Sequence, residues 1–181
     1  MMNTEILIDD NHELFSRKGM NYTVFASDYQ LIRYYTLLLI QRSRPRSDER
    51  LLLEQQVSEI IKNAVKHGNG SDPKKEVKVW YRFSQTDARL IVEDEGPGFK
   101  DIEKWNIFNS KRQEYIDKED FIGLMSYVSW KSAKSDKYDG GNAMFAALEY
   151  WNLGVVYSGA RNTVAVGKKF ETNFMEMEGE E

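Results

Sequence analysis

Hydrophobic side chains recur at helical spacing in three stretches of the chain. The first begins near Ser27, and the spacing of Ser27 and Gln30 is typical of a capping box at a helix N-terminus. The apolar positions that follow are three and four residues apart, which predicts a helix with one buried stripe. That stripe comprises Leu31, Tyr34, Tyr35, Leu38 and Leu39.

Two further helices are predicted by the same criterion. One follows the break at Pro45 and runs from about Ser47 to Gly68. Its core-facing residues are Leu53, Val57, Ile60, Ile61 and Ala64. The other lies within "GGNAMFAALEYWNLG", where two glycines precede the helix and Gly154 ends it.

Strict alternation of hydrophobic and polar residues predicts β-structure elsewhere. A hairpin is expected where "EVKVWYRFS" turns at "QTDA" and returns through "RLIVED", because Val77, Val79, Tyr81 and Phe83 occupy alternate positions. A short strand at Tyr22–Phe25 and a closing hairpin around Gly159 complete the pattern. This mixture has too few βαβ units for a doubly wound sheet, so it predicts an α+β fold, a two-layer αβ sandwich.

The segment from Lys100 to Asp139 has a different character, since it is polar, lysine-bearing and rich in aromatics. Phe121, Leu124, Met125 and Val128 have helical spacing, which predicts at least one helix there. Residues 175–181 are expected to form a disordered acidic tail. With 181 residues in all, one domain spanning 1–181 is the default expectation.

Composition excludes several classes of function. The formal net charge of -4 argues against direct nucleic-acid binding, which needs a basic surface. Without cysteine and with only His12 and His67, thiolate and multi-histidine metal sites are implausible. The longest apolar stretch, "YYTLLLI", is far below the ~20 residues that a bilayer requires, and the N-terminus lacks signal-peptide character. We therefore expect a cytoplasmic protein without membrane partners.

The stretch "SEIIKNAVKHGN" places three polar side chains on one side of the second helix. Glu59 and Asn63 are four residues apart, and Lys66 follows three residues later. One interpretation is a solvated helix face. The other is a site for a magnesium nucleotide, with the Asn63 amide oxygen on the cation, the Glu59 carboxylate as a base and the Lys66 ammonium on phosphate.

Two glycine-containing stretches are further candidates for ligand contact. In "VEDEGPGF", Gly96 and Gly98 follow a hydrophobic strand, and the Asp94 carboxylate could accept a hydrogen bond from an exocyclic amine such as that of adenine. In "DGGNAM", the backbone amides at a helix N-terminus favour phosphate. An ordinary turn and a flexible start of a helix are the alternatives. The P-loop, dinucleotide and eukaryotic kinase motifs are absent.

The order of these motifs resembles that of the GHKL, or histidine kinase-like, ATPase superfamily over about residues 20–170. "SEIIKNAVKHGN" looks like the N box and "DEGPGF" like the G1 box. Glu59 stands where histidine kinases usually carry Asn and anti-sigma factor serine kinases carry Glu, so the chain is most similar to the latter branch. The resemblance implies a mixed, mostly antiparallel sheet covered by helices on one face.

The resemblance also implies roles for individual residues. Glu59 would be the general base on a partner's serine, Asn63 the Mg²⁺ ligand, and Asp94 the acceptor for the adenine amino group of ATP. The remaining contacts to ATP would come from Lys66, Gly96, Gly98, Gly141, Asn142, Ala143, Met144 and Thr163. His67 is interpreted as a structural residue at the helix end.

The implied activity is that of a serine/threonine kinase that phosphorylates an antagonist (anti-anti-sigma) protein and sequesters a sigma factor or similar regulator, in a homodimer. The chain departs from the family pattern at Ala143, where a second glycine is usual. It also departs in residues 100–139, an enlarged lid or partner-docking insert. The alternative is a non-catalytic nucleotide-binding module that switches between partners.

Overall fold

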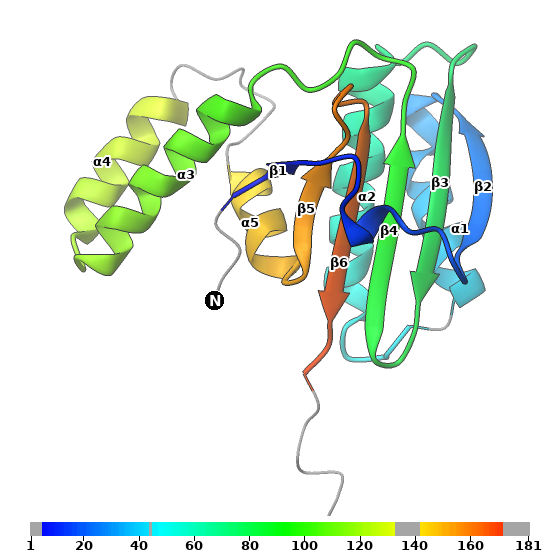
Figure 1. Cartoon of the computed structure of the whole chain (residues 1–181), viewed down its shortest axis with the longest axis horizontal. Coiled ribbons are helices and arrows are strands. Elements are labelled where there is room, and N and C mark those ends of the chain that lie inside the picture. Colours follow the sequence, from blue (N-terminus) through cyan, green and yellow to red (C-terminus); the bar gives the residue numbers. More distant parts are fainter. Residues whose placement is uncertain (1–4, 44, 133–141, 172–181) are drawn as a thin grey trace, which may run out of the picture.

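The computed structural model describes residues 5–43, 45–132 and 142–171 (Figure 1). Within them, six strands form one sheet in the order β1-β5-β6-β4-β3-β2. The strands are β1 (Leu7–Ile8), β2 (Asn21–Ala26), β3 (Glu76–Phe83), β4 (Asp87–Glu93), β5 (Gly154–Tyr157) and β6 (Thr163–Lys169). β1 runs parallel to β5 and every other neighbouring pair is antiparallel. The α+β fold with a mixed, mostly antiparallel sheet is therefore confirmed.

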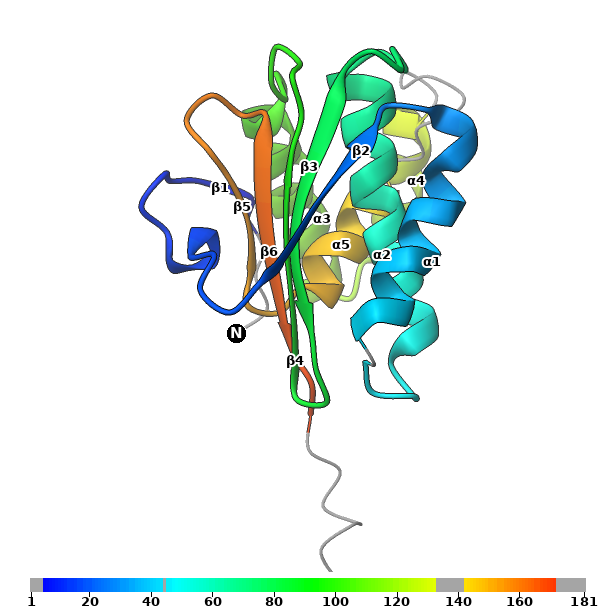
Figure 2. The same ribbon diagram turned by 90° about the vertical axis from the view of Figure 1, so that its right-hand side faces the viewer.

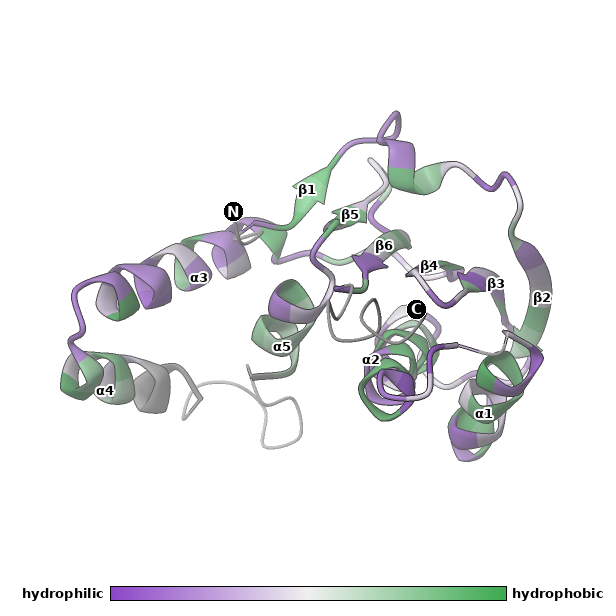
Figure 3. Ribbon diagram, turned by 90° about the horizontal axis from the view of Figure 1, so that it is seen from below, coloured by the Kyte–Doolittle hydropathy of each residue, from purple (hydrophilic) through white to green (hydrophobic). Residues whose placement is uncertain are grey.

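Three helices cover one face of this sheet (Figure 2). They are α1 (Ile32–Ser43), α2 (Arg50–Asn63) and α5 (Asn142–Tyr150). Figure 3 shows the three helices side by side along the same side of the sheet. The predicted stripe of α2 is confirmed, because Leu53, Val57, Ile60, Ile61 and Ala64 are all buried. The alternating residues of β3 are buried against the same core.

The predicted stripe of the first helix is partly wrong. Leu31 and Tyr34 are 41% and 59% exposed, and the buried residues of α1 are Ile32, Tyr35, Thr36, Leu39 and Ile40. A 3₁₀ turn, Tyr29–Leu31, precedes the α-helix, so Leu31 lies outside α1. Within α1 the buried face is displaced by about one residue from the predicted stripe, toward Thr36 and Ile40. The N-cap is Asp28, whose Oδ1 accepts from the Gln30 amide at 2.9 Å, while Ser27 is buried and bonded elsewhere.

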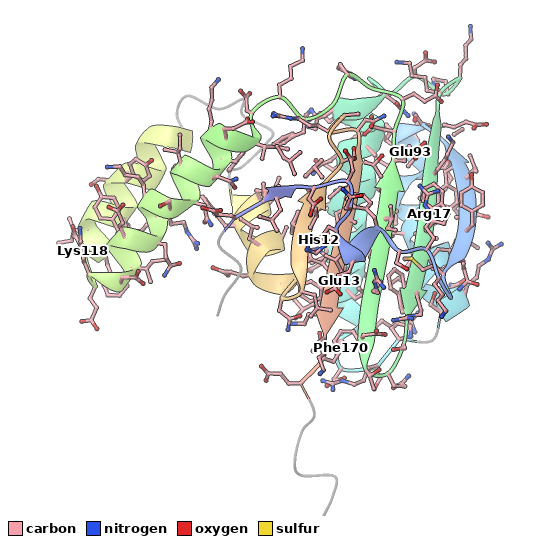
Figure 4. All side chains as sticks on the ribbon, in the orientation of Figure 1. His12, Glu13, Arg17, Glu93, Lys118 and Phe170 are labelled. Carbon is pink, nitrogen blue, oxygen red and sulfur yellow. The ribbon has the colours of Figure 1, made fainter. Side chains whose placement is uncertain are left out.

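The other face of the sheet is partly covered by the N-terminal segment (Figure 2). A short 3₁₀ helix, Glu13–Phe15, buries Leu14 against Ile91, Val156 and Ala165. Arg17 lies over the Trp80 ring at 3.7 Å from its centroid. It also pairs with Glu93, and both residues are labelled in Figure 4. This segment and β1 were not predicted from the sequence.

In its described part, the segment after residue 100 forms two helices, α3 (Ile102–Asp117) and α4 (Phe121–Ser132), which project to one side of the molecule (Figure 1). The prediction of at least one helix there is confirmed. Phe108 of α3 packs against Phe145 of α5 with ring centroids 5.0 Å apart, and Arg112 pairs with Glu149. The α3 helix is thus fixed to the body through α5. Within the described residues, no helix is long and apolar enough to cross a membrane.

Candidate functional site

A cavity of about 400 Å³ lies between α2, the loop after β4, the start of α5 and strands β5 and β6. Its volume is within the usual range of small-molecule sites. Six of the predicted site residues line it: Glu59, Asn63, Asp94, Gly98, Ala143 and Met144. The structure therefore brings together residues from both predicted boxes and from the predicted phosphate-binding helix.

The α2 side of the cavity presents Glu59 and Asn63 on successive turns. Lys62 donates to both carboxylate oxygens of Glu59, at 3.2 and 3.3 Å, so Glu59 is ion-paired within its own helix. After Asn63 the helix continues as a π-helical turn, Ala64–Gly68. A π-helical turn holds more residues than an α-helical turn, so the side chains after Asn63 are rotated about the helix axis. As a result His67 and Gly68 line the cavity, whereas Lys66 does not.

Asp94 follows β4 directly and is half-buried in the cavity wall. Its Oδ1 accepts a hydrogen bond from the Gly96 amide at 2.7 Å. Burial raises the pKa of the Asp94 carboxyl above its ordinary value, an effect that the Gly96 hydrogen bond and the charge of Lys75 only partly offset. Within the described residues Oδ2 has no hydrogen-bond partner, so this lining residue keeps one carboxylate oxygen available as an acceptor.

One side of the loop after Asp94 is held by Asn69, which is 2% exposed. The Asn69 Oδ1 accepts from the Glu95 amide at 2.7 Å. Its Nδ2 donates to Ser27 Oγ at 2.6 Å and to the Glu76 carbonyl at 2.8 Å. Sequence reasoning missed this residue, although it ends the same "HGN" stretch that was singled out.

The other side of the loop is held by the turn between β5 and β6. Asp94 and Asn162 exchange two hydrogen bonds, from the Asp94 amide to the Asn162 carbonyl and from Asn162 Nδ2 to the Asp94 carbonyl, both 2.9 Å. Gly98 has φ of 88°, and a Cβ there would overlap the Ala160 carbonyl oxygen. These contacts fix the position of the Asp94 carboxylate in the cavity wall.

Thr163 is not among the residues that line the cavity. It begins β6 opposite Glu93, and successive side chains of a strand point to opposite faces. Asn162, Val164 and Val166 line the cavity, while Ala165 packs under the N-terminal segment. The structure therefore places Asn162 where the sequence predicted Thr163, and the adenine contact of Thr163 stays a prediction without support from this geometry.

Only part of the predicted phosphate-binding helix N-terminus lies within the described residues. Ala143 and Met144, in the first turn of α5, line the cavity, and Asn142 begins that helix. Gly141 lies outside the described residues. Gly96 is not part of the lining, because its role is the close approach to Gly68 beneath the loop.

The segment that follows the β4 loop borders one side of the cavity. Lys100, Asp101 and Trp105 line it. Arg161, from the β5–β6 turn, also lines it and donates to Glu103 of α3, with Nη1 to Oε2 at 3.0 Å. This pair lowers the pKa of Glu103, chiefly through the hydrogen bond. The start of α3 is thereby tied to the same turn that holds Asp94.

A helix with Glu and Asn on one side, facing an aspartate at a strand end above a mostly antiparallel sheet, is the arrangement of a histidine kinase-like ATPase. The profile of the family described as histidine kinase-like ATPase domain matches residues 29–119, half of the chain, and the chain belongs to this family. The matched region contains Glu59, Asn63 and Asp94 and ends before α4. Membership implies that the protein binds ATP.

Among curated proteins, the chain is similar to the anti-sigma F factor of Shouchella clausii (strain KSM-K16). The two are 24% identical over 89 residues, which cover 49% of this chain and 61% of that protein. The chain thus spans about three fifths of the relative that it matches. This similarity supports the anti-sigma branch of the family.

Proposed function

We propose that the protein is an ATP-dependent serine/threonine kinase of the anti-sigma type, which phosphorylates an antagonist protein and sequesters a sigma factor or similar regulator. The observation that carries the proposal is the position of Glu59, one helical turn from Asn63 and in the wall of the same cavity as Asp94. The similarity to an anti-sigma F factor supports the choice of partners.

Each wall of the cavity would take one part of the nucleotide. Asp94 Oδ2 accepts a hydrogen bond from the adenine amino group, and the backbone amides at the start of α5 receive the phosphates. Within the described residues no group of three or more His, Asp or Glu side chains could hold a metal ion. An Asn63 oxygen beside phosphate oxygens and water nevertheless suits Mg²⁺, which keeps several waters and needs few protein ligands.

The proposed transfer requires a base and positioning rather than covalent catalysis by the protein. Glu59 accepts the proton of the partner's serine hydroxyl as the serine oxygen bonds to the γ-phosphorus. The bond from the γ-phosphorus to the bridging oxygen breaks, and ADP leaves. Mg²⁺ held by Asn63 would supply charge stabilisation for the phosphates.

The proposal is tested by incubating the protein with radiolabelled MgATP and candidate antagonist proteins. The wild-type protein should label a serine of the antagonist, and Glu59→Gln should abolish labelling while ATP affinity is retained. Lys62→Gln is the matched control, since it removes the ion-pair partner but leaves the base. An antagonist that is bound but never labelled would overturn the kinase assignment.

A second candidate is a non-catalytic module in which ATP or ADP selects the binding partner. The observation that favours it is the Glu59–Lys62 ion pair, which engages the carboxylate expected to act as base. Ala143 in the first turn of α5, where the family usually has glycine, favours it too. In this case Glu59→Gln leaves partner exchange unchanged, a result that the kinase proposal forbids.

A further inference from the structure

Asp94 alone does not explain the selection of adenine. An ionised carboxylate only accepts hydrogen bonds, so it can take the amine of adenine or the N1–H and 2-amino donors of guanine. The Gly96 amide already occupies Oδ1 of Asp94, at 2.7 Å, which leaves Oδ2 as the unoccupied oxygen. A single free oxygen can accept one hydrogen bond from the amine of adenine. The ring nitrogens beside that amine are acceptors, so their hydrogen bonds must come from another group of the protein.

Tyr157 is the side chain placed to meet such a nitrogen. It is the last residue of β5 and lines the cavity together with Val155, while Val156 between them faces the opposite side of the sheet. It lies opposite Val164 of β6, two residues from Asn162, and the Asn162 backbone is bonded to Asp94. The ends of three neighbouring strands thus bring Tyr157, Asn162 and Asp94 to one wall.

The hydroxyl of Tyr157 is not needed for packing. Its ring stacks on Phe99, with centroids 5.6 Å apart and planes at 19°, and a phenylalanine would make the same contact. Within the described part of the chain the hydroxyl has no hydrogen bond to backbone or side chain. Burial, and then the charge of Asp94, raise the pKa of Tyr157, so the phenol remains a donor at neutral pH.

We propose that the Tyr157 hydroxyl is a specificity-determining group that donates a hydrogen bond to a purine ring nitrogen beside the amine held by Asp94. The nitrogens that flank that amine are N1 and N7. Tyr157 thereby completes an acceptor–donor pair on the wall of the cavity, in which Asp94 accepts and Tyr157 donates. The inference rests on the proposed binding of ATP in this cavity.

The test is calorimetric titration of the full-length protein with MgATP, 1-deaza-ATP and 7-deaza-ATP, for the wild type and Tyr157→Phe. Tyr157→Phe should weaken ATP binding about tenfold, the effect of one hydrogen bond lost in a partly buried site. The analogue that lacks the contacted nitrogen should bind the wild type about tenfold less tightly than ATP does, and it should bind Tyr157→Phe and the wild type equally.

Tyr150→Phe is the matched control, because it removes a buried phenol hydroxyl that lies outside the cavity lining. It should leave the affinity for all three nucleotides unchanged. The inference is overturned if Tyr157→Phe binds ATP as the wild type does, or if it loses affinity equally for all three nucleotides. A wild-type protein that binds no ATP would overturn the proposed function itself, and this inference with it.

Discussion

Gly96 and Gly68 lie backbone against backbone beneath the cavity. A Cβ atom at Gly96 would overlap the Gly68 carbonyl group, and a Cβ at Gly68 would overlap the Asp94 carboxylate. The end of the α2 helical segment and the loop after β4 can approach this closely only because both positions are glycine. The contact sets the distance between the two halves of the site, which are far apart in the sequence.

Gly96→Ala should therefore abolish ATP binding. The obstruction is backbone, so it cannot be relieved by rotating a side chain, and the loop that carries Asp94 must move away from α2. Overpacking of this kind costs about 1–3 kcal/mol of the free energy of unfolding. Chemical denaturation and calorimetric titration measure the two effects.

Gly70→Ala is the comparison for this substitution, because Gly70 has φ of +65° but open space where a Cβ would lie. It should cost about 1 kcal/mol through backbone strain alone and leave ATP affinity unchanged. Equal loss of ATP binding in both variants would show that the Gly96–Gly68 contact has no special role.

Asp94→Asn should weaken ATP binding and yet make the nucleotide-free protein more stable. The asparagine can keep the bond to the Gly96 amide, but its amino group would then face the adenine amine, donor against donor. We expect a loss in affinity of about 10- to 100-fold. Stability rises because a half-buried carboxylate, to which no cationic side chain among the described residues is bonded, is replaced by a neutral group.

The gain in stability from Asp94→Asn should depend on pH. The folded-state pKa of Asp94 is raised above its ordinary value of 3.8, so the folded state favours the protonated carboxyl. The stability contributed by this group is fully present below that ordinary value and is lost as pH rises through the raised folded-state pKa. The difference in Tm between the variant and the wild type should thus be small near pH 4 and largest at neutral pH. A difference that shrinks as pH rises contradicts this account.

Much of this fold could be predicted because the signals are local. The α2 stripe and the alternation along β3 depend only on helical and strand periodicity, and both are confirmed. Glu59 and Asn63 were predicted together because residues four apart in a helix share a face. Asp94 was predicted because it follows a buried strand directly.

The parts that were not predicted depend on irregularities in the backbone or on distant contacts. A 3₁₀ turn places Leu31 before the start of α1, and a π-helical turn brings His67 rather than Lys66 to the cavity. Asn162 and Thr163 are adjacent, so their side chains belong to opposite faces of the sheet. Which of the two faces the cavity depends on the register of β6, which the sequence alone does not give. β1 has two residues, and among the described strands it pairs with β5 alone, so no periodicity marks it.

Asn162→Ala should weaken ATP binding severalfold, whereas Thr163→Val should leave it unchanged. Asn162 Nδ2 holds the Asp94 carbonyl at 2.9 Å, and its loss frees the loop at the price of about 1 kcal/mol. Valine has nearly the shape of threonine, and the Thr163 side chain belongs to the face opposite the cavity. Titration with MgATP compares the two variants directly. The opposite ranking of affinities would restore the role first predicted for Thr163.

Asn69→Ala should be the most destabilising of these substitutions. It leaves the Glu95 amide, the Ser27 hydroxyl and the Glu76 carbonyl without their Asn69 partner in a buried site, at a cost of about 2–4 kcal/mol. Asn152→Ala is the matched control, since Asn152 also makes two side-chain bonds to backbone, both to the exposed Lys169. That control should cost less than about 1 kcal/mol in urea denaturation. Similar costs for both variants would mean that Asn69 does not anchor the loop.

The ion pair between Glu103 and Arg161 should control how firmly the start of α3 is attached to the β5–β6 turn. Glu103→Gln removes the charge that Arg161 binds, so amide hydrogen exchange in residues 102–117 should accelerate. The double variant Glu103→Arg with Arg161→Glu reverses the pair and should restore much of the protection. Lys104→Gln breaks the neighbouring Asp101–Lys104 pair, which does not reach the β5–β6 turn, and should leave exchange unchanged. If the double variant exchanges as fast as Glu103→Gln, the attachment of α3 does not depend on this pair.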